Sequence, residues 1–172
     1  MQQSFLTPRQ LWLALAAVSA GLAGASVALT VWLDLHPCHL CIFQRLLYLL
    51  LAGVGLAAGL LLPRRAARWI GFLALPLAAA GLAVAVQQSW LQAQPPGSIA
   101  CAIGEPGRIE SLVEWLGQLQ PELFLATGFC EEVELTILQL SLANWSVLGF
   151  AACLALGYLA WRPIRERRLF KS

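Results

Sequence analysis

The chain has 172 residues, of which 59% are hydrophobic and 12% are charged, against about 25% charged residues in ordinary globular proteins. This composition excludes a disordered chain, because disorder requires low hydrophobicity, and it argues against a soluble globule, whose surface needs more charge. The net charge is only +2 and the basic residues are not interleaved with aromatics, which argues against nucleic-acid binding. We therefore expect an integral membrane protein.

Four long apolar runs carry most of the hydrophobicity. They cover approximately residues 11–33, 42–62, 69–86 and 145–161. Each is close to the roughly 20 residues that a membrane-spanning helix needs, and none alternates in the manner of a barrel strand. The sequence predicts an all-α membrane protein, a four-transmembrane-helix bundle that forms a single integral membrane domain over residues 1–172.

The distribution of charge predicts the orientation of the bundle. Nine of the eleven basic residues lie before the first run, between the second and third runs, or after the fourth. Eight of the nine acidic residues lie in the other two connections. Because cytoplasmic loops are enriched in Lys and Arg, we expect both termini in the cytoplasm and two outer loops, at about 34–41 and 87–144.

The second outer loop carries signals for local structure. A short amphipathic helix is predicted by the spacing of Ile109, Leu112, Val113 and Leu116. This helix either lies on the outer membrane surface or packs on the end of the bundle, and the sequence leaves both open. Leu135, Leu138 and Leu142 predict another helical stretch leading into the fourth span. In the third span, Pro76 is expected to produce a kink.

The five cysteines are sorted by this topology. Cys153 lies inside the fourth span and is expected to be an inert packing thiol, whereas Cys38, Cys41, Cys101 and Cys130 lie outside. Outside the cytoplasm thiols tend to be oxidised, so four outer cysteines suggest two disulfides with three possible pairings. The natural pairing is Cys38–Cys41 with Cys101–Cys130.

The first pair forms a C-x-x-C motif. By chain entropy, a ring this small contributes only about 2 kcal/mol of stability, against about 3–4 kcal/mol for a Cys101–Cys130 ring. A Cys38–Cys41 disulfide would therefore stabilise the fold little, and this pair is a plausible redox centre. A structural disulfide and a zinc site, with four cysteines or with His36 or His39, remain alternatives. Haem attachment is excluded, because Ile42 stands where a histidine is required.

Arg45 is a charged residue close to this motif on its C-terminal side. It follows Cys41 by four residues, which places both on one helix face. A guanidinium there favours a thiolate and suits an anionic oxygen of a bound cofactor, while an arginine that snorkels to the headgroups is the alternative. A dithiol at the membrane beside a fixed charge indicates electron exchange with a lipid-soluble acceptor, a quinone above all. Because Arg45 is near a helix end, its loss is expected to cost the bundle little stability.

With these features the chain resembles the disulfide bond formation protein B (DsbB) family of bacterial inner membranes over nearly its whole length. The resemblance rests on four spans, the segment 37–45 (PCHLCIFQR), Cys101 and Cys130, and the segment 121–130. It implies a multi-pass protein of the bacterial cell inner membrane. It also implies a protein-disulfide oxidoreductase that reoxidises a periplasmic thioredoxin-fold thiol oxidase of the DsbA type and passes the electrons to a membrane quinone, ubiquinone or menaquinone.

The resemblance also implies roles for individual residues. The partner's thiolate would attack Cys101 and release Cys130, and Cys130 would then attack Cys38. Cys41, freed as a thiolate, would pass electrons to the quinone, with Arg45 as the quinone-binding residue. These four cysteines are the expected catalytic residues, and no metal is expected.

Two other classes of protein compete with this assignment, and the chain differs from some DsbB relatives at the third span. The first class is a non-enzymatic four-helix membrane protein with static disulfides, and the second is a quinone reductase of the vitamin K epoxide type. In the second, the C-x-x-C would be expected late in the chain, which disfavours it. Some DsbB relatives have a histidine near the outer end of the third span, where this chain has Gln87 and Gln88.

The charge distribution gives a direct test of orientation. A reporter that is active only outside the cytoplasm, fused after Ser172, should show no activity in cells, because the basic C-terminal segment is retained inside. Strong reporter activity at this position would overturn the predicted topology.

Overall fold

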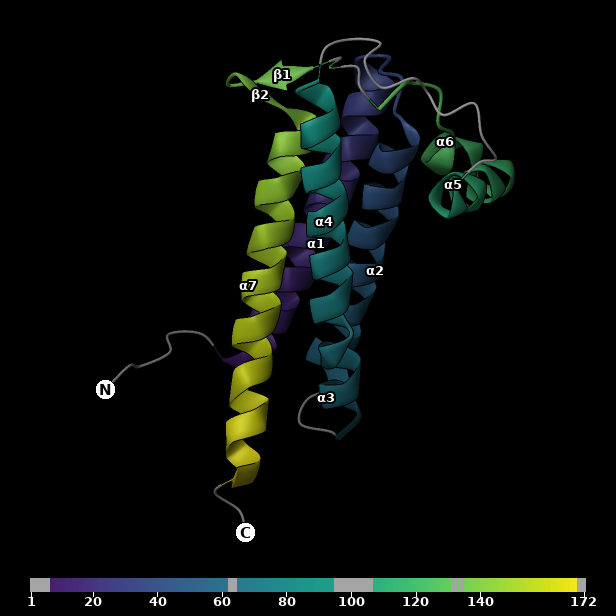
Figure 1. The fold of residues 1–172 in the computed structure, drawn as a ribbon. Coiled ribbons are helices and arrows are strands. Elements are labelled where there is room, and N and C mark those ends of the chain that lie inside the picture. The colour runs from purple at the N-terminus through teal and green to yellow at the C-terminus, as the bar shows by residue number, and fades with distance from the viewer. Residues whose placement is uncertain (1–6, 62–64, 95–106, 131–132, 134, 170–172) are drawn as a thin grey trace.

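The computed structural model describes residues 7–61, 65–94, 107–130, 133 and 135–169. Four long helices lie side by side in a bundle (Figure 1): α1 (Pro8–Trp32), α2 (His39–Leu61), α4 (Ala74–Gln92) and α7 (Leu142–Leu169). The segments long and apolar enough to cross a membrane are Pro8–Trp32, His39–Leu61, Trp69–Gln92 and Leu142–Arg162. The predicted four-helix membrane class is confirmed. The third segment continues to Gln92, beyond its predicted end at residue 86.

The third span is interrupted near its start. A short helix, α3 (Arg65–Phe72), is separated from α4 by Leu73. Proline has no backbone N–H, so Pro76 cannot bond back to the carbonyl four residues earlier. Instead, the N–H of Leu73 bonds the carbonyl of Ile70 at 3.1 Å and closes a tighter turn. The break thus lies in the turn before the proline that predicted it.

The bundle core combines a few large side chains with many small ones. Trp12 and Leu15 of α1, Leu51 of α2 and Phe150 of α7 are fully buried. The ring of Tyr48 stacks on Phe150 with centroids 4.0 Å apart. Small residues let membrane helices approach closely, and the buried ones here include Ala23, Ala58, Ala74, Ala78, Ala85 and Ala160.

Two short helices lie beside α2. They are α5 (Arg108–Leu119) and α6 (Pro121–Phe124), and they extend away from the bundle near one of its ends (Figure 1). Val113 of α5 and Phe124 of α6 pack against Ile42 of α2. The amphipathic helix therefore exists and contacts the bundle, as in one of the two predicted alternatives. Its opposite face exposes apolar residues, namely Leu112, Trp115 and Leu119.

The helical stretch predicted before the fourth span is wrong. A small antiparallel hairpin of β1 (Thr136–Ile137) and β2 (Leu140–Ser141) stands there. Leu138 and Gln139 form its turn with φ of 53° and 65°, the positive values that two-residue hairpin turns require. The spacing of the leucines fits a helix and a hairpin equally well, so it did not discriminate between them.

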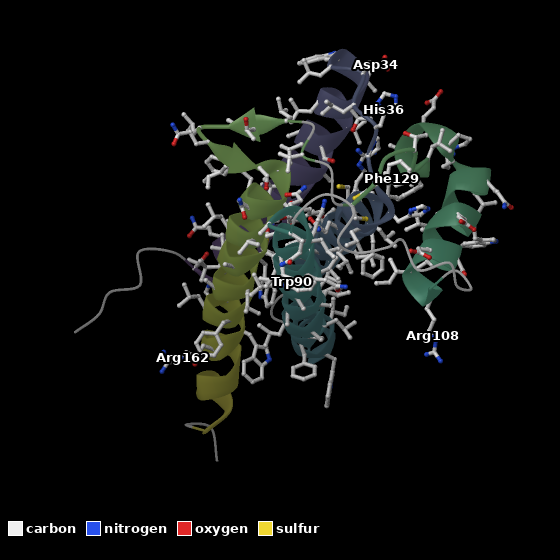
Figure 2. The ribbon with its side chains drawn as sticks, turned by 45° about the horizontal axis from the view of Figure 1, so that its top comes forward. Asp34, His36, Trp90, Arg108, Phe129 and Arg162 are labelled. Carbon is white, nitrogen blue, oxygen red and sulfur yellow. The ribbon has the colours of Figure 1, made fainter. Side chains whose placement is uncertain are left out.

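The two ends of the bundle differ in what they carry. Figure 2 shows Asp34, His36 and Phe129 at one end and Arg162 toward the other. Helix α1 begins and α7 ends at the end away from the hairpin (Figure 1). The residues of both predicted outer loops thus meet at a single end.

Gly81 gives a test of the helix packing. A methyl group at this position would collide with the ring of Phe150, which is fully buried and stacked on Tyr48. Gly81→Ala should therefore destabilise the bundle, by about 1–3 kcal/mol as is typical of overpacking. Thermal unfolding of the purified protein in detergent measures this loss as a lowered midpoint.

Gly53→Ala is the matched control. A methyl group at Gly53 meets no atom within 4 Å, and alanine is the better helix former, so its midpoint should stay the same or rise. Equal midpoints for the two variants would contradict the close packing of α4 on α7.

Candidate functional site

The C-x-x-C motif forms the start of α2. Cys38 is the N-cap residue: its carbonyl accepts from the N–H of Ile42 at 3.1 Å, and its Sγ accepts from the N–H of Cys41 at 3.4 Å. The Sγ atoms of Cys38 and Cys41 lie 3.0 Å apart as thiols. The positive end of the helix dipole favours negative charge at this position, so the spacing of the motif places both sulfurs at the helix end where this effect acts.

Cys130 joins this dithiol from the second outer loop. Its side chain forms a hydrogen bond with Cys38, and it also accepts from the backbone N–H of Leu40. The hydrogen bonds from Cys38 to Cys130 and Cys41, together with burial, raise the pKa of Cys38. The hydrogen bond from Cys38 lowers the pKa of Cys130. The two pKa shifts have opposite directions, so Cys130 is the more easily ionised of these two thiols.

Backbone contacts between the two outer loops position Cys130. The N–H groups of Thr127 and Gly128 both donate to the carbonyl of Pro37, at 3.0 and 3.3 Å. The backbone of Gly128 also approaches the carbonyl of His36 so closely that no side chain fits between them. Pro37, just before the C-x-x-C, and Gly128, two residues before Cys130, therefore hold the two outer loops together.

Arg45 is buried inside the protein, with 2% of its surface exposed. Its Nη1 donates to the carbonyl of Leu123 at 2.7 Å and its Nη2 donates to Oγ1 of Thr30 at 2.8 Å. Its Nε and Nη2 both donate to Oγ of Ser26. The snorkelling alternative does not fit this position. The burial of Arg45 argues against the expectation that its loss costs little stability, because the loss would remove the donor from half-buried acceptors in α1 and α6.

Two glutamines complete the polar surroundings of the dithiol. Nε2 of Gln88 donates to Sγ of Cys41 at 2.9 Å and to Sγ of Cys38 at 3.4 Å. Nε2 of Gln44 donates to Oε1 of Gln88 at 2.7 Å. Sequence reasoning assigned neither residue a role. For Gln44 the available signal was a polar side chain within an apolar span, which is costly unless it is paired. Gln88 lay beyond the predicted end of the third span, so no such signal was available for it.

A cavity of about 270 Å³ adjoins these groups. Cys41, Gln44, Arg45 and Gln88 form part of its wall. Apolar side chains, including Leu22, Ala25 and Leu29 of α1, form another part. The cavity therefore offers a sulfur, a cation and amides beside an apolar surface.

Two cysteines remain, Cys153 and Cys101. Cys153 is buried between α1 and α7, with its Sγ 3.4 Å from Oγ of Ser19, and its inertness stays a prediction. Cys101 lies outside the described residues, so the Cys101–Cys130 pairing is also still a prediction. The structure brings together three of the four predicted catalytic cysteines and places Arg45 one turn beyond them.

The fold and the sulfur cluster define a membrane-embedded thiol oxidoreductase. The chain matches the family described as disulfide bond formation protein DsbB over residues 8–160. It is 47% identical over 139 residues to disulfide bond formation protein B of Dechloromonas aromatica (strain RCB), covering 81% of this chain and 83% of the relative. It is 40% identical over 160 residues to the protein of that name from Azoarcus sp. (strain BH72), covering 91% and 95%. The chain belongs to the DsbB family.

The docking of the two outer loops is testable through Gly128. Gly128→Ala should push the loop away from the carbonyl of His36 and so separate Cys130 from Cys38. Formation of a Cys38–Cys130 disulfide under mild oxidation should then slow by about tenfold or more, because such reactions depend steeply on the alignment of the reacting atoms. Mass spectrometry of quenched samples measures the rate.

The experiment uses a background in which Cys41 and Cys101 are serine, so that Cys38 and Cys130 react with each other. Gly107→Ala, in the same outer loop, is the control, since its methyl group would make only an ordinary contact with Glu110. If both glycine variants cross-link at the rate of the parent protein, the docked arrangement is not the one that reacts.

Proposed function

We propose that the chain reoxidises a periplasmic dithiol oxidase of the thioredoxin fold and passes the electrons to a membrane quinone. The observation that carries this proposal is a series of sulfur contacts, from Cys130 to Cys38 and from Cys38 to Cys41. The series leads from the second outer loop to a cavity with Arg45 in its wall. A pair of static disulfides would not need a third sulfur against the first pair.

The proposed reaction is a series of thiol–disulfide exchanges. The partner's thiolate attacks Cys101 of a Cys101–Cys130 disulfide, forms a mixed disulfide and releases Cys130 as a thiolate. Cys130 then attacks Sγ of Cys38, so that a Cys38–Cys130 bond forms and the Cys38–Cys41 bond breaks. The electron pair of the broken bond remains on Cys41. The lowered pKa of Cys130 supports this order, because the attacking group must be a thiolate.

The cavity beside Cys41 fits the head of a quinone. A quinone supplies an acceptor for two electrons that is soluble in the bilayer. The volume of about 270 Å³ lies slightly below the ~300–1,000 Å³ typical of ligand pockets. Arg45 and Gln44 are the residues that would bind the oxygens, and the apolar wall from α1 would cover the ring. A fixed cation close to a site of developing negative charge is an effective electrostatic arrangement.

The proposed location is the bacterial inner membrane, with the dithiol facing the periplasm and both termini in the cytoplasm. The placement of Arg162 away from Asp34 and His36 supports this orientation (Figure 2). The sulfur cluster then meets the periplasmic partner at one end of the bundle, while the adjoining cavity lies among the spans.

Quinone reduction by the purified protein tests the proposal. With a reduced thioredoxin-fold dithiol protein as donor, the protein in detergent should reduce ubiquinone or menaquinone catalytically, which is followed by the quinone's absorbance. Arg45→Ala should lower kcat/KM for quinone by about tenfold or more, since hydrogen bonds to charged groups are worth about 1.5–3 kcal/mol. Arg45→Lys should retain part of the activity, because it keeps the charge but loses the planar fork.

The donor side provides the control for this variant. A single turnover between the reduced donor and the outer-loop cysteines should persist in Arg45→Ala, provided that its thermal midpoint shows a folded protein. Wild-type kcat and KM for quinone in Arg45→Ala would refute the role of Arg45. No quinone reduction by the unmodified protein would refute the proposed function.

A further inference from the structure

We propose that Gln88, oriented by Gln44, is a positioning residue that holds the sulfur of Cys41 as the leaving thiolate. This inference deepens the proposed function, because it concerns the exchange step in which Cys41 is released. It rests on the side-chain amides of Gln88 and Gln44, which join α4 to α2. Neither amide changes its charge with pH.

The first observation is the placement of the Gln88 amide across both sulfurs of the dithiol. Its Nε2 lies 2.9 Å from Sγ of Cys41 and 3.4 Å from Sγ of Cys38. An amide nitrogen has two N–H donors, so one group can serve both sulfurs. The shorter contact goes to Cys41, and both sulfurs line the cavity. The donor thus faces the sulfur on which the charge of the exchange step appears.

The second observation is what fixes the direction of this amide. Nε2 of Gln44 donates to Oε1 of Gln88 at 2.7 Å. If the Gln88 amide turned over, its NH₂ would face another NH₂ and its oxygen would face the sulfurs, so the contacts would be lost. Both glutamines are 3% exposed, which leaves little water to compensate. Gln44 therefore holds Gln88 as a donor toward Cys41.

The exchange step creates the need for such a donor. When the thiolate of Cys130 forms a bond to Cys38, the Cys38–Cys41 bond breaks and its electron pair goes to Sγ of Cys41. No proton is transferred, so Cys41 becomes an anion at a half-buried position. The rate depends on how well the leaving sulfur carries this charge, and a hydrogen bond to an anion is stronger than one to a neutral group.

Arg45 does not replace this hydrogen bond. Its guanidinium donates to Ser26, Thr30 and Leu123, so toward Cys41 it acts by charge. Among the residues that the structure describes, the charged and titratable groups that act on Cys41 are Arg45, one turn along the same helix, and the thiols of Cys38 and Cys130. Gln88 is the side chain of α4 that donates directly to the sulfur.

Alkylation of Cys41 tests the inference without quinone or partner. In the full-length chain, Cys38, Cys101 and Cys130 are changed to serine and Cys153 to alanine, so that iodoacetamide reports on Cys41. Gln88→Met should slow alkylation at neutral pH by about tenfold or more, from the usual strength of a hydrogen bond to a charged group. At strongly alkaline pH, where the thiol is ionised with either side chain, the two rates should become equal.

A second variant separates orientation from contact. Gln44→Met does not touch the sulfur but removes the group that directs Gln88, so it should slow alkylation in the same direction and by less. Combined with Gln88→Met it should add nothing further, because both act through one hydrogen bond. Gln87→Met, on the neighbouring exposed residue, is the matched control and should react as the parent protein does.

Two results would overturn the inference. One is an alkylation rate in Gln88→Met equal to that in Gln87→Met at neutral pH. The other is a difference that persists at alkaline pH, which would show altered access to Cys41 rather than an altered thiolate. Neither alkylation result depends on quinone reduction by the unmodified protein. A failure of the proposed function would appear only in the quinone-reduction assay, so the two failures can be distinguished.

Discussion

A polar group inside a membrane bundle has to find its partner within the protein, because the bilayer core supplies no water. This constraint explains the arrangement of the site. Arg45 is paired with α1 and α6, Gln88 is paired with Gln44 and the sulfurs, and Cys38 caps the helix that carries it. The partners of Arg45 and Gln88 come from other elements than their own, so satisfying these two groups also fixes how the spans and the outer loops sit around the dithiol.

The second outer loop is held to the bundle by two carbonyls in particular. Pro37 accepts from the segment just before Cys130, and Leu123 accepts from Arg45. The loop is thus attached on one side to the residues that precede the dithiol and on the other to the cation beside the cavity. Both ends of the proposed electron path are thereby connected to the loop that receives electrons first.

Hydropathy and charge predicted the four spans, because length and apolarity alone decide whether a helix can cross a bilayer. The C-x-x-C and Arg45 were also identified from the sequence, since helical spacing places them on one face. The hairpin before α7 was missed, because Leu138 and Gln139 adopt positive φ without a glycine or asparagine to signal it. The burial of Arg45 was missed too, since its partner Leu123 is 78 residues away in the chain.

The glutamine pair shows why the missing part of the site is tertiary in origin. Gln44 and Gln88 are separated by 44 residues, and no local pattern relates them. Each alone is a polar residue whose burial is unfavourable. Only when α2 and α4 pack does Gln44 donate to Oε1 of Gln88 and leave the NH₂ group of Gln88 directed at the sulfurs. The burial energy of the two amides is then offset by a donor that stays fixed while charge appears on Cys41, which is the preorganisation that an exchange between buried sulfurs requires.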